Sequence, residues 1–145
     1  MKKKNRAWEI IQFILPIIIS VFISYFIFNK QFNADEKNRL NENLNKLLDI
    51  NLQYPYVEDS LFIARWNENK NSNNDSSLRY QAYCEYAFNF LQNVSEYFNY
   101  NKSKIQSFVD MKDLIDQHKD WINMPEQKGA YPKEFFEFIN KFNEK

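Results

Sequence analysis

The sequence is poor in the residues that most catalytic and cofactor-binding motifs require. It has one glycine, Gly129, one cysteine, Cys84, one histidine, His118, and no threonine. A Walker loop, a dinucleotide fingerprint and a nucleophile elbow each need two or more glycines, so all three are excluded. One cysteine and one histidine cannot form the usual zinc cage or an internal disulfide. We therefore expect no cofactor and no metal site.

The scarcity of glycine limits the fold classes that the chain can adopt, and the distribution of charge limits the kinds of partner that it can bind. Tight β-hairpin turns rely on glycine, so this chain argues against an all-β fold. Residues 1–30 hold five of the 19 basic side chains and one of the 19 acidic ones, which leaves 14 and 18 in the remaining 115 residues. Nucleic acid binding requires a basic face, and this mildly acidic body predicts no nucleic acid partner.

One long apolar run lies near the start of the chain. Residues 13–28, FILPIIISVFISYFIF, carry no charge. The 21 residues of 8–28 would form a helix of about 31 Å, enough to cross a hydrocarbon core of roughly 30 Å. The rest of the chain is too short to wrap such a helix on all sides. The sequence predicts a basic flank at 1–7 and a transmembrane helix at 8–28 that has membrane lipid as its partner.

Two features bear on whether this helix is cleaved and how it is oriented. A signal peptide needs small residues before the cleavage site. If cleavage followed Ala34, bulky Phe32 would occupy the −3 position. We therefore expect no cleavage. Basic residues crowd the short N-terminal side more densely than the stretch beyond the helix, which favours a cytoplasmic N-terminus and a body outside the cytoplasmic membrane. The residues compared are Lys2, Lys3, Lys4 and Arg6 against Lys30, Lys37 and Arg39.

Ser20 and Ser24 lie four residues apart within the predicted span. Small residues on one helix face allow two helices to approach closely in lipid. In the simpler interpretation, which we favour, each hydroxyl donates to the carbonyl four residues earlier in its own helix. Self-association through this face stays open as the alternative. Trp8 and Tyr25 lie near the two ends of the span, where aromatic residues are typical of the membrane–water interface.

Apolar residues recur at helical spacing through the rest of the chain. They predict an all-α fold, in which the membrane helix continues as an amphipathic juxtamembrane helix over 29–52 and a helical bundle domain follows over 53–145. Pro55 is expected to open a short second helix, Ser77 to cap a long central one and Asp110 to cap a restart within the next, while Pro132 opens the last. The residues expected to face inward include Leu40, Leu44, Leu47, Val57, Leu61, Ala64, Tyr80, Tyr83, Cys84, Ala87, Phe90, Leu91, Val94, Ile105, Ile115, Trp121, Phe135 and Ile139.

Few residues of the body are candidates for a functional site. His118 lies on an apolar stripe and is interpreted as a structural histidine at the edge of the core, with a general base oriented by Glu58, Asp59 or Glu85 as the alternative. Cys84 is interpreted as a small apolar residue. The possible interaction surface comprises Glu58, Asp59, Arg65, Trp66, Arg79 and His118, and ion pairs between neighbouring helices are the simpler explanation of its charges.

Four segments in order behind the apolar run carry a resemblance to known proteins. They are YPYVEDSLFIARW (54–66), RYQAYCEYAFN (79–89), IDQHKDW (115–121) and YPKEFFEFIN (131–140). Together they resemble a family of uncharacterised bacterial single-pass membrane proteins with a small helical domain. They are similar, more loosely, to membrane-anchored phage abortive infection proteins. The second resemblance implies a role in phage defence and supplies no catalytic residues.

Three hypotheses of function follow. The first is a membrane-anchored, non-enzymatic interaction or sensing module with a protein partner or self-association. The second is a phage-defence effector whose anchor oligomerises through Ser20 and Ser24. The third is an enzyme that uses His118 with a carboxylate, and the absence of a recognisable catalytic motif places it last.

Overall fold

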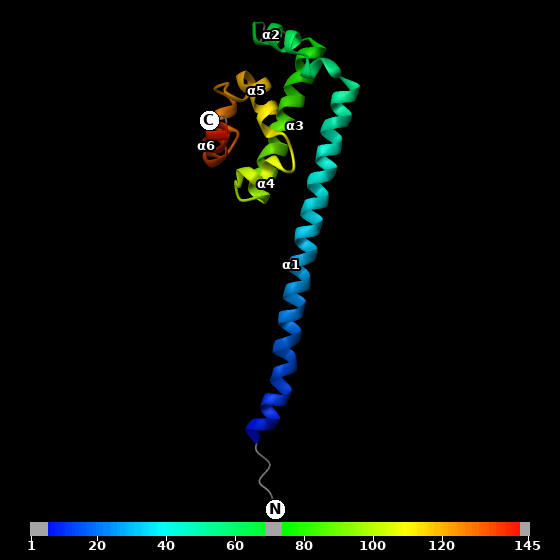
Figure 1. The fold of residues 1–145 in the computed structure, drawn as a ribbon, viewed down its shortest axis with the longest axis vertical. Coiled ribbons are helices and arrows are strands. Elements are labelled where there is room, and N and C mark those ends of the chain that lie inside the picture. The colour runs from blue at the N-terminus through cyan, green and yellow to red at the C-terminus, as the bar shows by residue number, and fades with distance from the viewer. Residues whose placement is uncertain (1–5, 69–73, 143–145) are drawn as a thin grey trace, which may run out of the picture. The chain divides into compact units, whose positions relative to one another are not determined.

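The computed structural model describes residues 6–68 and 74–142, with side chains from residue 14 onward. Within these ranges the chain forms six α-helices, two 3-10 helices and no strand, which confirms the predicted all-α fold (Figure 1). The elements are α1 (Arg6–Gln53), η1 (Pro55–Glu58), α2 (Ser60–Glu68), α3 (Asp75–Tyr97), α4 (Lys102–Gln106), α5 (Met111–Ile122), η2 (Gln127–Gly129) and α6 (Lys133–Phe142). Two compact units divide the chain, Met1–Arg39 and Leu40–Lys145.

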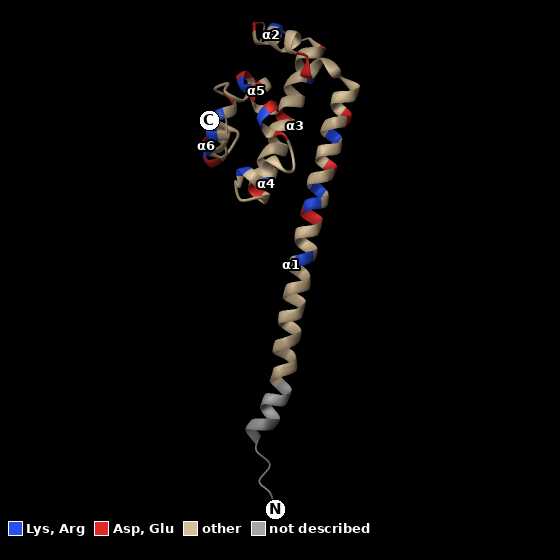
Figure 2. Ribbon diagram, viewed as in Figure 1, with Lys and Arg blue, Asp and Glu red and all other residues tan. Residues whose placement is uncertain are grey.

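The first part of α1 presents an exposed apolar surface. Every side chain from 14 to 28 is exposed, and Figure 2 shows a long uncharged stretch on this helix. α1 is long and apolar enough to cross a membrane, and it lies near the N-terminus. The helix continues through Pro16. Trp8, a predicted interfacial aromatic, lies outside the residues whose side chains are described.

The last part of α1 belongs to the bundle. Leu40 and Leu47 are buried and Leu44 is half-buried, as their helical spacing predicts. The second compact unit begins at Leu40, whereas the sequence placed the start of the bundle at residue 53. The difference arises because these leucines pack into the core of the bundle while still belonging to the helix that carries the apolar run.

α3 is the central helix of the bundle, as predicted. It packs against α5 and η1, while α2 packs against η1 and α5. The residues of α3 that were predicted to face inward are buried from Tyr80 to Val94, and beyond them Tyr97 and Phe98 are half-buried. Phe88, which was not predicted to face inward, is buried as well and stacks on Trp121 of α5 with ring centroids 5.6 Å apart. The buried apolar residues of α3 are Tyr80, Tyr83, Cys84, Ala87, Phe88, Phe90, Leu91 and Val94.

The predicted inward face of the second helix is confirmed for Val57, which is fully buried, and wrong for Leu61 and Ala64. Leu61 is 68% exposed and Ala64 is exposed as well, whereas Ile63 and Trp66 are buried. Pro55 does open a helical turn, but this is the 3-10 helix η1, and Asp59 then adopts an extended conformation. α2 therefore begins afresh at Ser60, and its phase does not continue from η1.

Two predicted helix caps have different outcomes. Asn74, not Ser77, caps α3, because its side-chain oxygen accepts a hydrogen bond of 2.7 Å from the Ser77 amide. Ser77 lies inside the first turn, where its hydroxyl accepts a hydrogen bond of 2.9 Å from Trp66 Nε1. The predicted restart at Asp110 is confirmed, since its carboxylate accepts from the Asp113 amide at the start of α5.

α3 ends in a turn that uses positive backbone angles without glycine. Asn99 and Tyr100 have φ values of 49° and 56°, a region that costs energy for residues with a side chain. The Tyr100 amide donates to the Ser95 carbonyl at 2.7 Å. Its ring packs edge-on against Phe138 of α6 at 5.3 Å. Packing against α6 thus holds the turn in place.

Truncation of Leu91 tests the placement of α3. Leu91 is fully buried, so Leu91→Ala should lower the free energy of unfolding by about 2–5 kcal/mol through the cavity that it leaves. Leu78→Ala is the matched control on the same helix, because Leu78 is 52% exposed and its loss should cost no more than about 0.5 kcal/mol. Urea unfolding of the full chain in non-ionic detergent measures both. Equal losses for the two variants would contradict the placement.

Candidate functional site

A cluster of titratable side chains surrounds His118 inside the bundle. The Tyr80 hydroxyl lies 3.0 Å from His118 Nδ1, and the Cys84 sulfur lies 3.8 Å from the same nitrogen. On the other side of the ring, Nε2 lies 3.6 Å from Glu58 Oε1. This distance exceeds an ordinary hydrogen bond, and Nε2 has no hydrogen-bond partner among the residues that the structure describes. We name Glu58, Tyr80, Tyr83, Cys84 and His118 the His118 cluster.

Three elements bring the His118 cluster together. The two tyrosines and the cysteine lie on one face of α3, because they are spaced three and four residues apart. Glu58 ends η1, and the Gln117 side chain of α5 donates a hydrogen bond to its backbone carbonyl. His118 has non-helical backbone angles (φ −109°, ψ 18°), so α5 is kinked where the ring enters the core. The kink and the turn at η1 set the distance between the imidazole and the carboxylate.

Glu58 is the most exposed member of the cluster, with 27% of its side chain exposed. The Tyr83 hydroxyl donates a hydrogen bond to Oε1. Partial burial by itself would raise the pKa of the Glu58 carboxyl, but the nearby His118 and the Tyr83 hydroxyl outweigh that effect. The net result is a pKa below the ordinary value of 4.5, so Glu58 is ionised at neutral pH.

The tyrosines and the cysteine of the cluster stay protonated. Burial is the main cause that raises the pKa of Tyr80. Burial and the hydrogen bond to Glu58 raise the pKa of Tyr83. Burial also raises the pKa of the Cys84 thiol. A thiol held in this state is a poor nucleophile, which agrees with the interpretation of Cys84 as a small apolar residue.

The cluster contains a histidine and a carboxylate, as a catalytic dyad does, but a substrate cannot reach the histidine in this structure. A general base must come within hydrogen-bond reach of a substrate, and the exposed fraction of His118 is 0%. The histidine expected at the edge of the core thus lies fully inside it. Among the described residues, no group of three or more metal-ligating side chains is found, and neither described pocket is lined by a member of the cluster.

The structure separates the six residues of the possible interaction surface. Trp66 and His118 are buried, with 4% and 0% exposed, so they do not belong to a surface of the folded bundle. Their apolar contacts explain the burial: the Trp66 ring lies 4.8 Å from Tyr80 and the His118 ring 5.6 Å from it. Glu58 is half-buried within the cluster. The exposed members are Asp59, Arg65 and Arg79.

Two of the exposed members serve local structure. Arg79 pairs with Asp75 at 2.9 Å within α3, and its guanidinium lies 4.6 Å from the ring centre of Tyr54. For Arg79 the charged partner is thus on its own helix, and the contact with another segment is a cation–π contact. Asp59 accepts a hydrogen bond of 2.7 Å from the Phe62 amide, which satisfies one of the free amides at the start of α2.

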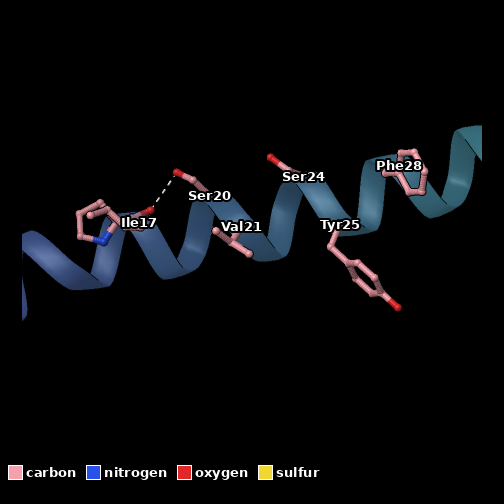
Figure 3. A pocket seen from close by; sticks show the side chains of 7 residues that line it. Ile17, Ser20, Val21, Ser24, Tyr25 and Phe28 are labelled. Carbon is pink, nitrogen blue, oxygen red and sulfur yellow. Dashed lines mark hydrogen bonds between the residues drawn. The ribbon is translucent and has the colours of Figure 1, made fainter.

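The serine face of α1 lies beside an open groove of about 640 Å³ (Figure 3). Ser20 Oγ donates to the Pro16 carbonyl at 2.8 Å, which confirms the local interpretation for this serine. Figure 3 shows the Ser24 hydroxyl on the same side of the helix, with Tyr25 directed away from it. Self-association through Ser20 and Ser24 stays a prediction. The groove is lined by Pro16, Ile17, Ser20, Val21, Ser24, Tyr25 and Phe28.

Sequence reasoning missed most of the His118 cluster as a unit. It named Glu58 as one of three carboxylates that could orient His118, and the structure selects Glu58. It placed Tyr80, Tyr83 and Cys84 in the core without connecting them to the histidine. The available signal was that a single polar residue on an apolar stripe needs polar partners in the opposing stripe, and the hydroxyls and thiol of α3 are those partners.

Comparisons with protein-family models, with curated proteins and with solved structures gave no match to this chain. The resemblance to bacterial single-pass membrane proteins and to phage abortive infection proteins therefore stays a prediction.

The lowered pKa of Glu58 predicts how stability depends on pH. Because the pKa is lower in the folded chain than its ordinary value of 4.5, the contribution of the carboxylate to the free energy of unfolding is fully present above that value. It is lost as the pH falls through the lowered folded value. Glu58→Gln should remove this part of the dependence, so the stability difference between wild type and variant should shrink as the pH is lowered from neutral to below 4.5.

Urea unfolding across this pH range measures the difference. Glu137→Gln is the control, because Glu137 is exposed and a hydrated carboxylate gains little from folding. A stability difference between wild type and Glu58→Gln that does not change with pH would show that the folded chain does not favour the charged form of Glu58.

Proposed function

We propose that the protein is a single-pass, membrane-anchored interaction module without catalytic activity. The observation that carries this proposal is the apolar surface of residues 14–28, where every side chain is exposed and none is charged. A large apolar side chain gains about 1.5–3 kcal/mol when it leaves water. A continuous helical surface of such side chains is stable against lipid and unfavourable in water.

The orientation in this proposal follows from the basic residues. Lys2, Lys3, Lys4 and Arg6 precede the apolar run within a few residues of one another, which favours a cytoplasmic N-terminus and a bundle outside the cytoplasmic membrane. The partners of the bundle would then be met on the outer side.

The closed core supports a role without catalysis. The one histidine of the chain is buried by Tyr80, Tyr83 and Cys84 on one side and by Glu58 on the other. A polar group enclosed in this way has a structural use, because it fixes how η1, α3 and α5 meet. Substrate chemistry at His118 would require the core to open.

The exposed parts of α2 and α3 support an interaction with another protein. Leu61 and Arg65 lie one turn apart on α2, and Leu78 and Arg79 follow each other on α3, and all four are exposed. The two helices are neighbours, since Trp66 of α2 is hydrogen-bonded to Ser77 of α3. Arginine is enriched at protein interfaces, and an exposed apolar side chain beside it adds contact area that a partner can cover.

Chemical cross-linking tests the proposal. A membrane-impermeant, amine-reactive cross-linker applied to intact cells should join the wild-type protein to a specific partner. Leu61→Asp/Arg65→Ala should reduce recovery of that partner at least about fivefold, because it removes the apolar side chain of Leu61 and the positive charge of Arg65. Lys46→Ala/Leu48→Asp is the matched control, since these residues are exposed on α1 and lie outside the proposed surface.

The outcomes separate the parts of the proposal. Recovery of the same bulk membrane proteins with wild type and both variants would refute the interaction module. Cross-links that form only after the cells are opened would refute the orientation and leave the interaction standing.

A further inference from the structure

A pocket of about 490 Å³ opens on the bundle where α5, η2 and α6 meet. Its volume lies within the range of small-molecule sites. It shares no residue with the His118 cluster or with the exposed leucines and arginines of α2 and α3. The lining residues are Asn123, Lys128, Tyr131, Lys133, Phe136 and Asn140.

The charge of the pocket has one sign. Lys128 and Lys133 contribute two ammonium groups, and the other four lining residues are uncharged. Glu137 lies 3.5 Å from the Lys133 ammonium, but both side chains are well exposed, so water screens this pair and the lysine stays available. An anion that enters the pocket would meet two cations and no lining carboxylate.

The position of Lys133 does not serve the stability of its helix. Lys133 is the first residue of α6, where the helix dipole disfavours a cation. Its pairing with Glu137 also has the less favourable order, because a lysine that precedes a glutamate by four residues stabilises a helix less than the reverse. The positive charge is thus placed beside the positive end of a helix, which strengthens the local attraction for an anion.

The walls of the pocket are aromatic. Tyr131 and Phe136 pack edge to face, with ring centroids 6.1 Å apart and an interplanar angle of 81°. Tyr131 is buried and its hydroxyl donates to the Glu85 carbonyl at 3.5 Å, so its phenol group is engaged with α3. Phe136 is half-buried, and its ring, with the small exposed part of Tyr131, provides apolar contact area for a planar group.

We propose that this pocket binds a small organic anion, in which a phosphate or carboxylate group is attached to a planar apolar body. Lys128 and Lys133 bind the anionic group through charge-assisted hydrogen bonds. Tyr131 and Phe136 contact the planar body. This site is independent of the membrane-anchored role proposed above.

Equilibrium dialysis with phenyl phosphate tests the site. The full chain is held in nanodiscs of phosphatidylcholine, and binding should weaken as salt is raised because charge attraction drives it. Lys128→Gln/Lys133→Gln should weaken binding at least about tenfold, since it removes both cations. Lys46→Gln/Lys104→Gln removes two exposed lysines of the same unit away from the pocket, and it should bind as the wild type does.

Two results would overturn the proposal. One is the absence of measurable binding to the wild-type chain at millimolar phenyl phosphate. The other is equal binding by the wild type and the Lys128→Gln/Lys133→Gln variant, which would mean that the probe binds elsewhere on the protein or to the lipid.

A second arm distinguishes a soluble anion from a lipid headgroup. One third of the phosphatidylcholine is replaced by phosphatidylglycerol, at a salt concentration that screens the membrane surface. Loss of phenyl phosphate binding by the wild type would support a headgroup phosphate as the occupant. Unchanged binding would support a soluble anion.

Discussion

Removal of apolar side chains from water is the constraint on which this chain depends, and the chain meets it in two ways. From Leu40 onward, the apolar stripes of the helices cover one another, and α3 contributes a buried stripe that extends from Tyr80 to Val94. From 14 to 28 the apolar side chains are exposed. Apolar area left in water carries a free-energy cost. The proposed insertion of this helix into a bilayer would remove that cost.

The ionised carboxylate of the His118 cluster stays in contact with water. Glu58 keeps part of its carboxylate exposed, while burial raises the pKa of Tyr80 and Cys84 and keeps them neutral. A fully buried, uncompensated charge would cost far more than a buried hydroxyl or thiol. The His118 cluster is therefore compatible with a stable core, and it also joins η1 to α3 and α5 at one place.

Sequence periodicity predicted the elements well where one helix keeps one phase. The inward-facing residues of α3 and the leucines of α1 pack into the core as their spacing indicates. Periodicity failed where a new helix begins out of phase with the one before it. Asp59 is extended and interrupts the helical conformation between η1 and α2, and Leu61 faces outward as a result. It also failed where two residues compete for one role, since Asn74 takes the capping position that Ser77 could have filled. The contact between Glu58 and His118 depends on how three separate elements pack, and no spacing within one helix contains that information.

The central claim is that residues 14–28 lie in lipid, and nitroxide accessibility tests it most directly. A spin label at Val21→Cys reports from the apolar run, and one at Leu48→Cys reports from an exposed site on the same helix. Cys84 is fully buried and should not react in the folded protein. In liposomes, the label at 21 should collide readily with dissolved oxygen and rarely with a water-soluble nickel complex, and the label at 48 should show the opposite. Equal collision of both labels with the nickel complex would place the apolar run in water and contradict the account.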